Sequence, residues 1–133
     1  MKNMEKKIAV LISKIEQAAD LDYGSKASVR KYNRMQDWVF KTFQKYEMLN
    51  DEELGLIVKL TCHQNPLVRA YITWSLICWK KLSFEELKNY YQILHVALVE
   101  LKGDIKKTYQ IGIDLWKHNL SAVCNDYFPE LEN

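Results

Sequence analysis

The stretch that decides the fold runs from Asn65 to Trp79 and reads NPLVRAYITWSLICW. Proline is favoured at the first position of a helix, because the N–H that it lacks would have no partner there. The residues after Pro66 are apolar on every side of a helical wheel, and Arg69 is the single charge among them. Such a helix is covered by its neighbours on most sides. The stretch therefore predicts a central helix that begins at Pro66.

Helical periodicity also dominates the rest of the chain. The sequence has four glycines and two prolines, and apolar and polar residues nowhere alternate over the length of a strand, so strands have little support. With the central helix, which should end at Trp79 or Lys80, the pattern predicts an all-α fold of about six helices. Of the other five helices, the first should end before Asp20, the second should run from Ser25 to about Glu47, and the third from Glu52 to His63. The fifth helix should begin at the capping-box pair Ser83 and Glu86, and the sixth should run from Ile105 to His118.

Composition indicates one globular domain that spans residues 1–133. The chain has 48% apolar and 27% charged residues, as folded domains do and disordered chains do not. The segment 120–133 has no basic residue, and we expect a loosely ordered tail there. No apolar run reaches the roughly 18 residues that spanning a bilayer needs, and the three cysteines show no close spacing. We therefore expect a cytoplasmic protein with reduced thiols and no membrane partner.

The second half of the chain contains an imperfect internal repeat. Residues 52–54 align with residues 85–87, and residues 68–80 align with residues 105–117. The offset grows by about one helical turn, so the second copy should have the longer first helix. Repeats of this length are typical of stacked helical hairpins, in which neighbours cover each other's apolar faces. The sequence therefore predicts a stack of antiparallel helical hairpins.

The turn that precedes the central helix resembles that of a HEAT repeat. In that repeat an Asp or Asn precedes a Val-Arg pair, and here Asn65 and Pro66 precede Val68 and Arg69. Residues 32–116 are also similar to a small bacterial family of HEAT-like domains of unassigned function. The second copy departs from the pattern, because it has a lysine in place of the arginine and no proline. The resemblance implies a scaffold that binds proteins, or in some cases nucleic acid.

Arg69 has two interpretations. A lone arginine in an apolar helix must find a carboxylate or backbone carbonyls, because a buried unpaired charge is costly. We expect a structural clamp at the repeat turn, formed with Asn65 and Pro66. The alternative is an arginine that anchors a ligand.

The sequence predicts no catalytic site, no cofactor and no metal. A zinc site needs about four ligands, which pairs such as CxxC or HxxxH usually announce, and the chain has neither spacing. His63 and His118 lie at predicted helix ends, where the helix dipole favours a positively charged ring. The acidic pairs at residues 52–53 and 85–86 lie in the first turns of helices, which also suits the dipole. No glycine-rich phosphate loop is present. We expect that the protein is not an enzyme.

The second predicted helix has two contrasting sides. On a helical wheel, one side is apolar and should face the core; it carries Val29, Tyr32, Gln36, Val39, Phe40 and Phe43. The other side carries Arg30, Arg34, Trp38, Lys41 and Lys45. A tryptophan among cations is typical of binding surfaces. The alternative is that Trp38 packs under another helix, against Trp74 or Tyr71, beside a solvated basic face.

Two functions fit this sequence. The first is a non-catalytic protein-binding module, such as a small bacterial regulatory or toxin-neutralising protein, that uses the surface around Trp38. The second is a nucleic-acid binder in which the cations contact phosphates and Trp38 stacks on a base. Residues 1–50 carry ten Lys or Arg against six Asp or Glu, whereas residues 103–133 carry three against five. A charged partner should therefore meet the N-terminal half.

Overall fold

The chain folds into six α-helices and two short 3-10 helices within residues 2–43, 49–79 and 82–119, the ranges that this computed structural model describes. These ranges contain no strand, and the predicted all-α class is confirmed. The helices are α1 (Lys2–Gln17), α2 (Lys26–Phe43), α3 (Asp51–Val58), α4 (Pro66–Trp79), α5 (Phe84–Glu100) and α6 (Gly103–Asn119), and the 3-10 helices are η1 (Ala18–Asp20) and η3 (Lys59–Cys62). Lys45 and the predicted tail at 120–133 lie outside the described residues.

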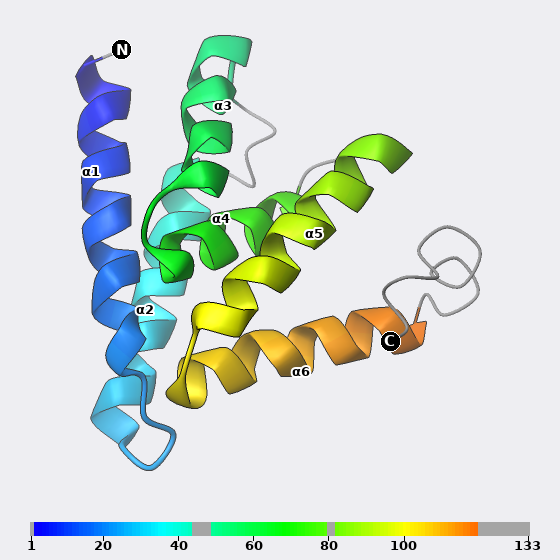
Figure 1. Cartoon of the computed structure of the whole chain (residues 1–133). Helices are drawn as coiled ribbons and strands as arrows, with labels where there is room; N and C mark the ends of the chain where they lie inside the picture. The colour runs from blue at the N-terminus through cyan, green and yellow to red at the C-terminus, as the bar shows by residue number, and fades with distance from the viewer. Residues whose placement is uncertain (1, 44–48, 80–81, 120–133) are drawn as a thin grey trace.

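Successive helices run back and forth as stacked hairpins (Figure 1). The helices α1 and α2 lie antiparallel, and α3 returns alongside them. The most extensive contact between two helices joins α4 to α5, and α4 also touches α1, α3 and η3. Helix α6 turns back from the end of α5 and meets η1 at the far end of the first hairpin. The chain thus closes around α4.

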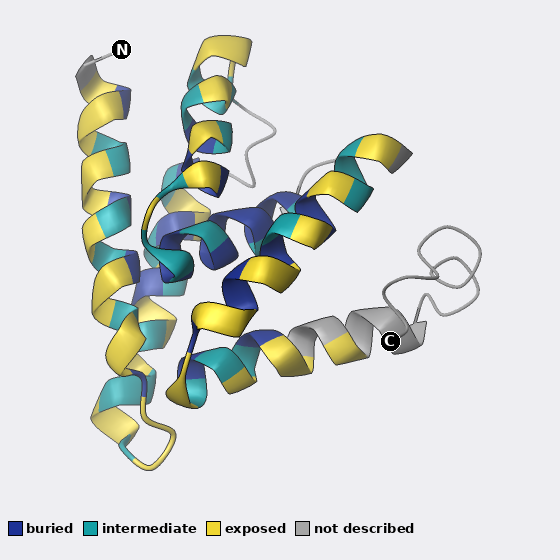
Figure 2. Cartoon of the chain, in the orientation of Figure 1, coloured by how far each residue is buried: buried dark blue, intermediate teal, exposed yellow. Residues whose placement is uncertain are grey.

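Helix α4 forms the centre of the core, as its sequence predicted. Its buried residues lie on most of its circumference (Figure 2): Leu67, Val68, Ala70, Tyr71, Ile72, Thr73, Ser75 and Leu76. Val68, Ile72 and Leu76 have no exposed surface. Burying each of these side chains contributes about 1.5–3 kcal/mol relative to leaving it in water.

Two complete capping boxes start the helices on either side of α4. The Asn50 side chain accepts a hydrogen bond from the Glu53 backbone N–H at 2.8 Å, and the Glu53 carboxylate accepts one from the Asn50 N–H at 3.1 Å. Ser83 and Glu86 repeat this exchange at 3.2 and 3.1 Å before α5. Each box satisfies backbone donors that a helix start leaves without an intrahelical partner. The predicted box at Ser83 is confirmed.

The loop after η1 is tied to the start of α6 by polar contacts. The backbone N–H of Tyr23 donates to the Asp104 carboxylate at 2.7 Å. The Tyr23 hydroxyl also forms a hydrogen bond with the Thr108 hydroxyl. These contacts span most of the chain and hold its first hairpin against its last described helix.

Two predicted features of the helices were wrong. The third helix does not remain α-helical to His63, because it tightens into η3 at Lys59; there the Thr61 hydroxyl donates to the Val58 carbonyl at 2.8 Å. Phe40 does not lie in the core but is 46% exposed, and Met35 is buried instead. The buried side of α2 is turned by roughly half the rotation between successive residues. That turn brings Met35 inward, against α1.

No helix in the described ranges is both long and apolar enough to cross a membrane.

Two glycines should respond in opposite ways to substitution by alanine. Gly103 has a φ of 73°, so Gly103→Ala places an alanine in the left-handed region and should lower the free energy of unfolding by about 1–2 kcal/mol. Gly55 lies in α3, where an added methyl would touch nothing within 4 Å. Gly55→Ala should therefore raise the free energy of unfolding by up to about 1 kcal/mol. Urea unfolding followed by circular dichroism measures both, and equal stability of the two variants would contradict the expectation.

Candidate functional site

The outer side of α2 carries three of the predicted cations in exposed positions. Arg30, Arg34 and Lys41 are all exposed. Asp37, which we did not include in the predicted surface, is exposed on the same side; it lies three residues after Arg34 and four before Lys41, so the three are neighbours on the helix surface. We call Arg30, Arg34, Asp37 and Lys41 the α2 basic face. This face therefore carries both positively and negatively charged side chains.

Trp38 lies at the margin of this face and is only partly exposed. Its ring packs against the core, and its centroid is 6.0 Å from that of Phe43 in an edge-to-face arrangement. The Nζ atom of Lys14 lies 5.2 Å from the centroid of the Trp38 ring, within the range of a cation–π contact. Trp38 therefore contacts α1 through Lys14. This matches the alternative in which Trp38 packs under another helix, although the expected partners, Trp74 and Tyr71, lie on α4.

A cavity of about 480 Å³ opens between α1 and α2. Three cations line it: Lys14 comes from α1, and Lys31 and Arg34 come from α2. Among the described residues of the lining, Asp20 alone is acidic, and the buried side chains of Leu21 and Met35 form an apolar wall. Lys14 and Lys31 were not predicted as site residues, because nothing in the linear pattern indicates that these two lysines line one cavity.

A second cavity of about 200 Å³ lies among α2, α4 and α6. A chain of hydrogen bonds crosses it. The Tyr71 hydroxyl donates to Gln36 Oε1 at 2.6 Å, and Gln36 Nε2 donates to the Tyr32 hydroxyl at 3.1 Å. Tyr32 also has a hydrogen bond with Tyr109 of α6. Gln36 was predicted on the inner side of its helix, and this chain accounts for a polar residue there.

Desolvation changes the acidity of two groups that line the second cavity. Burial raises the pKa of Tyr32 from 10.0 to about 12; the hydrogen bond with Tyr109 opposes this shift, and the charge of Tyr23 adds to it. Burial of its sulfur raises the pKa of the Cys78 thiol from 9.0 to about 11, although the residue as a whole is exposed. Because the thiolate is the reactive form, Cys78 is not activated as a nucleophile at neutral pH.

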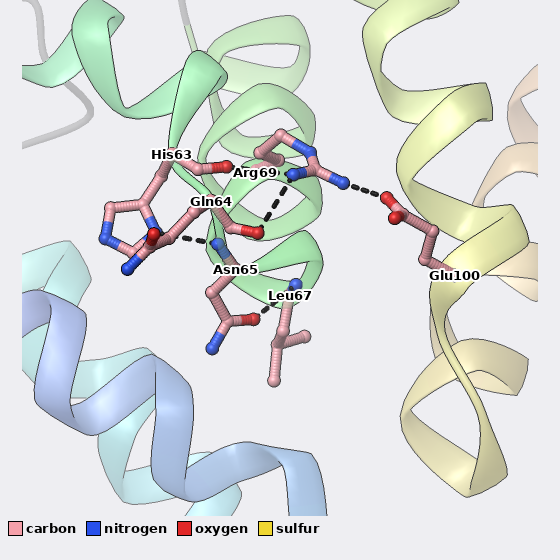
Figure 3. A network of polar contacts seen from close by, with 6 residues as sticks. All are labelled: His63, Gln64, Asn65, Leu67, Arg69 and Glu100. Carbon is pink, nitrogen blue, oxygen red and sulfur yellow. Dashed lines mark hydrogen bonds and ion pairs between the residues drawn. The ribbon is translucent and has the colours of Figure 1, made fainter.

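Arg69 connects the turn before α4 with the end of α5 (Figure 3). Its Nη1 atom donates to the carbonyl oxygens of His63 at 3.0 Å and Gln64 at 3.1 Å, and its Nη2 atom pairs with the Glu100 carboxylate. The Arg69 side chain is 18% exposed, and that of Glu100 is 53% exposed. These are the contacts of a structural clamp, in which the guanidinium serves both the turn and a neighbouring helix.

Asn65 and Pro66 complete this turn. The Asn65 side chain accepts a hydrogen bond from the Leu67 N–H at 2.9 Å, and the Asn65 N–H donates to Nδ1 of His63 at 3.0 Å (Figure 3). Pro66 is the first residue of α4. The backbone of the turn is therefore held by side chains within the turn itself, in addition to Arg69.

Removal of the Arg69 guanidinium should cost much more than removal of the Glu100 charge. Arg69→Met leaves the carbonyls of His63 and Gln64 without this donor and should lower the free energy of unfolding by about 1–3 kcal/mol. Glu100→Gln changes an exposed ion pair and should cost less than about 1 kcal/mol. Urea unfolding compares the two variants. Equal losses would show that the ion pair, and not the contact with the turn, provides the stability.

Stability should fall in alkali because of Tyr32. The unfolded chain loses this proton near pH 10, whereas the folded chain keeps it to about pH 12. The contribution of protonated Tyr32 to the free energy of unfolding is therefore complete below pH 10. It is lost as the pH rises from 10 to 12, which lowers the free energy of unfolding by about 3 kcal/mol. Tyr32→Phe should flatten the fall in the free energy of unfolding over that range. Both proteins are compared in a Cys78→Ser background, because the thiol acts in the same direction between pH 9 and 11. Identical slopes would exclude Tyr32 as the cause.

Within the described ranges, no three His, Cys, Asp or Glu side chains gather as they would to hold a metal ion. Comparison of the chain with models of protein families, with curated proteins and with solved structures found no match.

Proposed function

We propose that the protein is a non-catalytic binding module that presents the α2 basic face to an acidic region of another protein. The observation that carries this proposal is the exposure of Arg30, Arg34 and Lys41 along one side of a single helix. Phe40, which is 46% exposed and lies three residues after Asp37, adds apolar contact area at the edge of this face. Aromatic residues and arginines are both enriched in protein interfaces.

Asp37 supports a protein partner over nucleic acid. It lies among the cations, where it would repel a phosphate backbone, whereas a protein surface can offer it a lysine, an arginine or a backbone N–H. Trp38 also favours this choice. Its ring is partly buried and has the Lys14 ammonium over it, so it offers less of a stacking platform than an exposed tryptophan.

For the biological role, we propose a small bacterial regulatory or toxin-neutralising protein, which would act by covering the surface of its partner. We also propose that the stacked hairpins are of the HEAT type. The support for this assignment is the turn in which Asn65 caps α4 and Arg69 binds the preceding carbonyls. HEAT-like stacks commonly serve as scaffolds for macromolecular contacts.

Reversing the charge of the α2 basic face should abolish partner binding. Tagged wild-type protein and the variant Arg30→Glu/Arg34→Glu are used to capture partners from the source cells, and each captured protein is purified and titrated by calorimetry. We expect the reversal to weaken binding at least about tenfold, with an affinity for the wild type that falls as salt rises. The matched control is Lys59→Glu/Lys102→Glu, which reverses two exposed lysines away from α2.

The control should bind as the wild type does, and all three proteins should show the same helical circular dichroism. A partner that binds all three proteins equally would overturn the proposed surface. The same proteins are titrated with single-stranded and duplex oligonucleotides at low and moderate salt. Saturable oligonucleotide binding at moderate salt that only the Arg30→Glu/Arg34→Glu variant loses would replace the protein-binding proposal with the nucleic-acid one.

A further inference from the structure

The cavity between α1 and α2 has the dimensions of a small-molecule site. Its volume of about 480 Å³ lies within the range of roughly 300–1,000 Å³ that ligand pockets occupy. Its walls come from two helices and from η1 between them. Such a seam between adjacent helices is a common location for ligand sites in helical proteins.

The cavity walls combine positive charge with apolar surface. The ammonium groups of Lys14 and Lys31 and the guanidinium of Arg34 come from different helices or different turns, yet all three residues line one hollow. Asp20 supplies the one carboxylate among the lining residues that the structure describes. Like charges that share a concave wall repel one another, and the surrounding protein strengthens the field inside a cleft. A bound anion would relieve that repulsion.

The cations of the lining favour an anion, and its apolar part further restricts which anions fit. Leu21 and Met35 are buried and line the cavity, with relative exposures of 7% and 6%. Inorganic phosphate or sulfate would leave this surface in contact with water. A molecule with an apolar body and one anionic group would instead cover the apolar wall and meet the cations with its charge.

Lys14 is held in place for such a role. It is half-buried, and its Nζ atom lies 5.2 Å from the centroid of the Trp38 ring. The contact restricts a side chain that would otherwise sample many rotamers, so less conformational entropy is lost when the ammonium binds an anion. This gives the buried side of Trp38 a function that is separate from partner binding.

From this cavity we infer that the protein binds a small amphipathic anion, an organic carboxylate, sulfonate or phosphate ester with an apolar body, between α1 and α2. The inference does not depend on the proposed protein partner, although Arg34 belongs to both surfaces. The test therefore leaves Arg30 and Arg34 intact, and it uses Lys14 and Lys31, which lie outside the α2 basic face.

The probe is 8-anilinonaphthalene-1-sulfonate, and N-phenyl-1-naphthylamine serves as its neutral analogue. Both fluoresce in apolar surroundings, but only the first carries an anion. We expect saturable 1:1 binding of the sulfonate to the folded protein. The variant Lys14→Gln/Lys31→Gln should weaken sulfonate binding at least about tenfold and change binding of the neutral analogue less than about twofold. The matched control is Lys6→Gln/Lys26→Gln, which removes one exposed lysine from each of the same two helices outside both the cavity and the α2 basic face, and it should bind as the wild type does.

A variant with the opposite effect keeps the test decisive if the lysine variant is unstable. Asp20→Asn removes a carboxylate from the lining and should strengthen sulfonate binding about two- to fivefold. Circular dichroism and a cooperative thermal transition are recorded for every protein, because this sulfonate also binds partly folded chains. The inference is overturned if the folded wild type shows no saturable binding, if the control variant loses as much affinity as the cavity variant, or if Asp20→Asn has no effect.

Discussion

The structure depends on covering a helix that is apolar around its whole circumference. Helix α4 buries Val68, Ala70 and Thr73 completely, and at about 100° per residue these side chains point to different sides of its axis. One neighbour could not exclude water from all of them. The chain therefore surrounds α4 with α1, α3, η3 and α5, and the back-and-forth path of the hairpins follows from that requirement.

The single charge of α4 is accommodated at the end of this helix. Arg69 lies one turn after Pro66, where its guanidinium can reach the carbonyls of the preceding turn and the carboxylate of Glu100. One turn further along, the same guanidinium would lie among fully buried side chains, where an unpaired cation is very costly. The position of Arg69 thus joins the beginning of α4 to the end of α5 and leaves the middle of α4 apolar.

The first hairpin has a different character, because its two helices meet over a seam that is partly polar. Trp38 and Phe40 exchange their expected positions there: the tryptophan packs beneath Lys14 of α1, and the phenylalanine is exposed. This exchange follows from the rotation of α2 about its axis, which decides the side chains that it buries. It also places three cations of two helices around one cavity, beside an outward face that carries both signs of charge.

The sequence by itself determined the helices, the capping box at Ser83 and the central position of α4, because these depend on residues within one or two turns of one another. It also indicated the clamp at Arg69, since a lone charge in an apolar helix requires a partner. Only the tertiary structure decided which side of α2 is buried and which lysines share a cavity. Several apolar and aromatic residues of α2 compete for the core, and small rotations about the helix axis exchange them at little local cost. The packing of α1 on α2 places Lys14 over Trp38 and in the same cavity lining as Lys31. A linear pattern of residues does not specify how two helices pack.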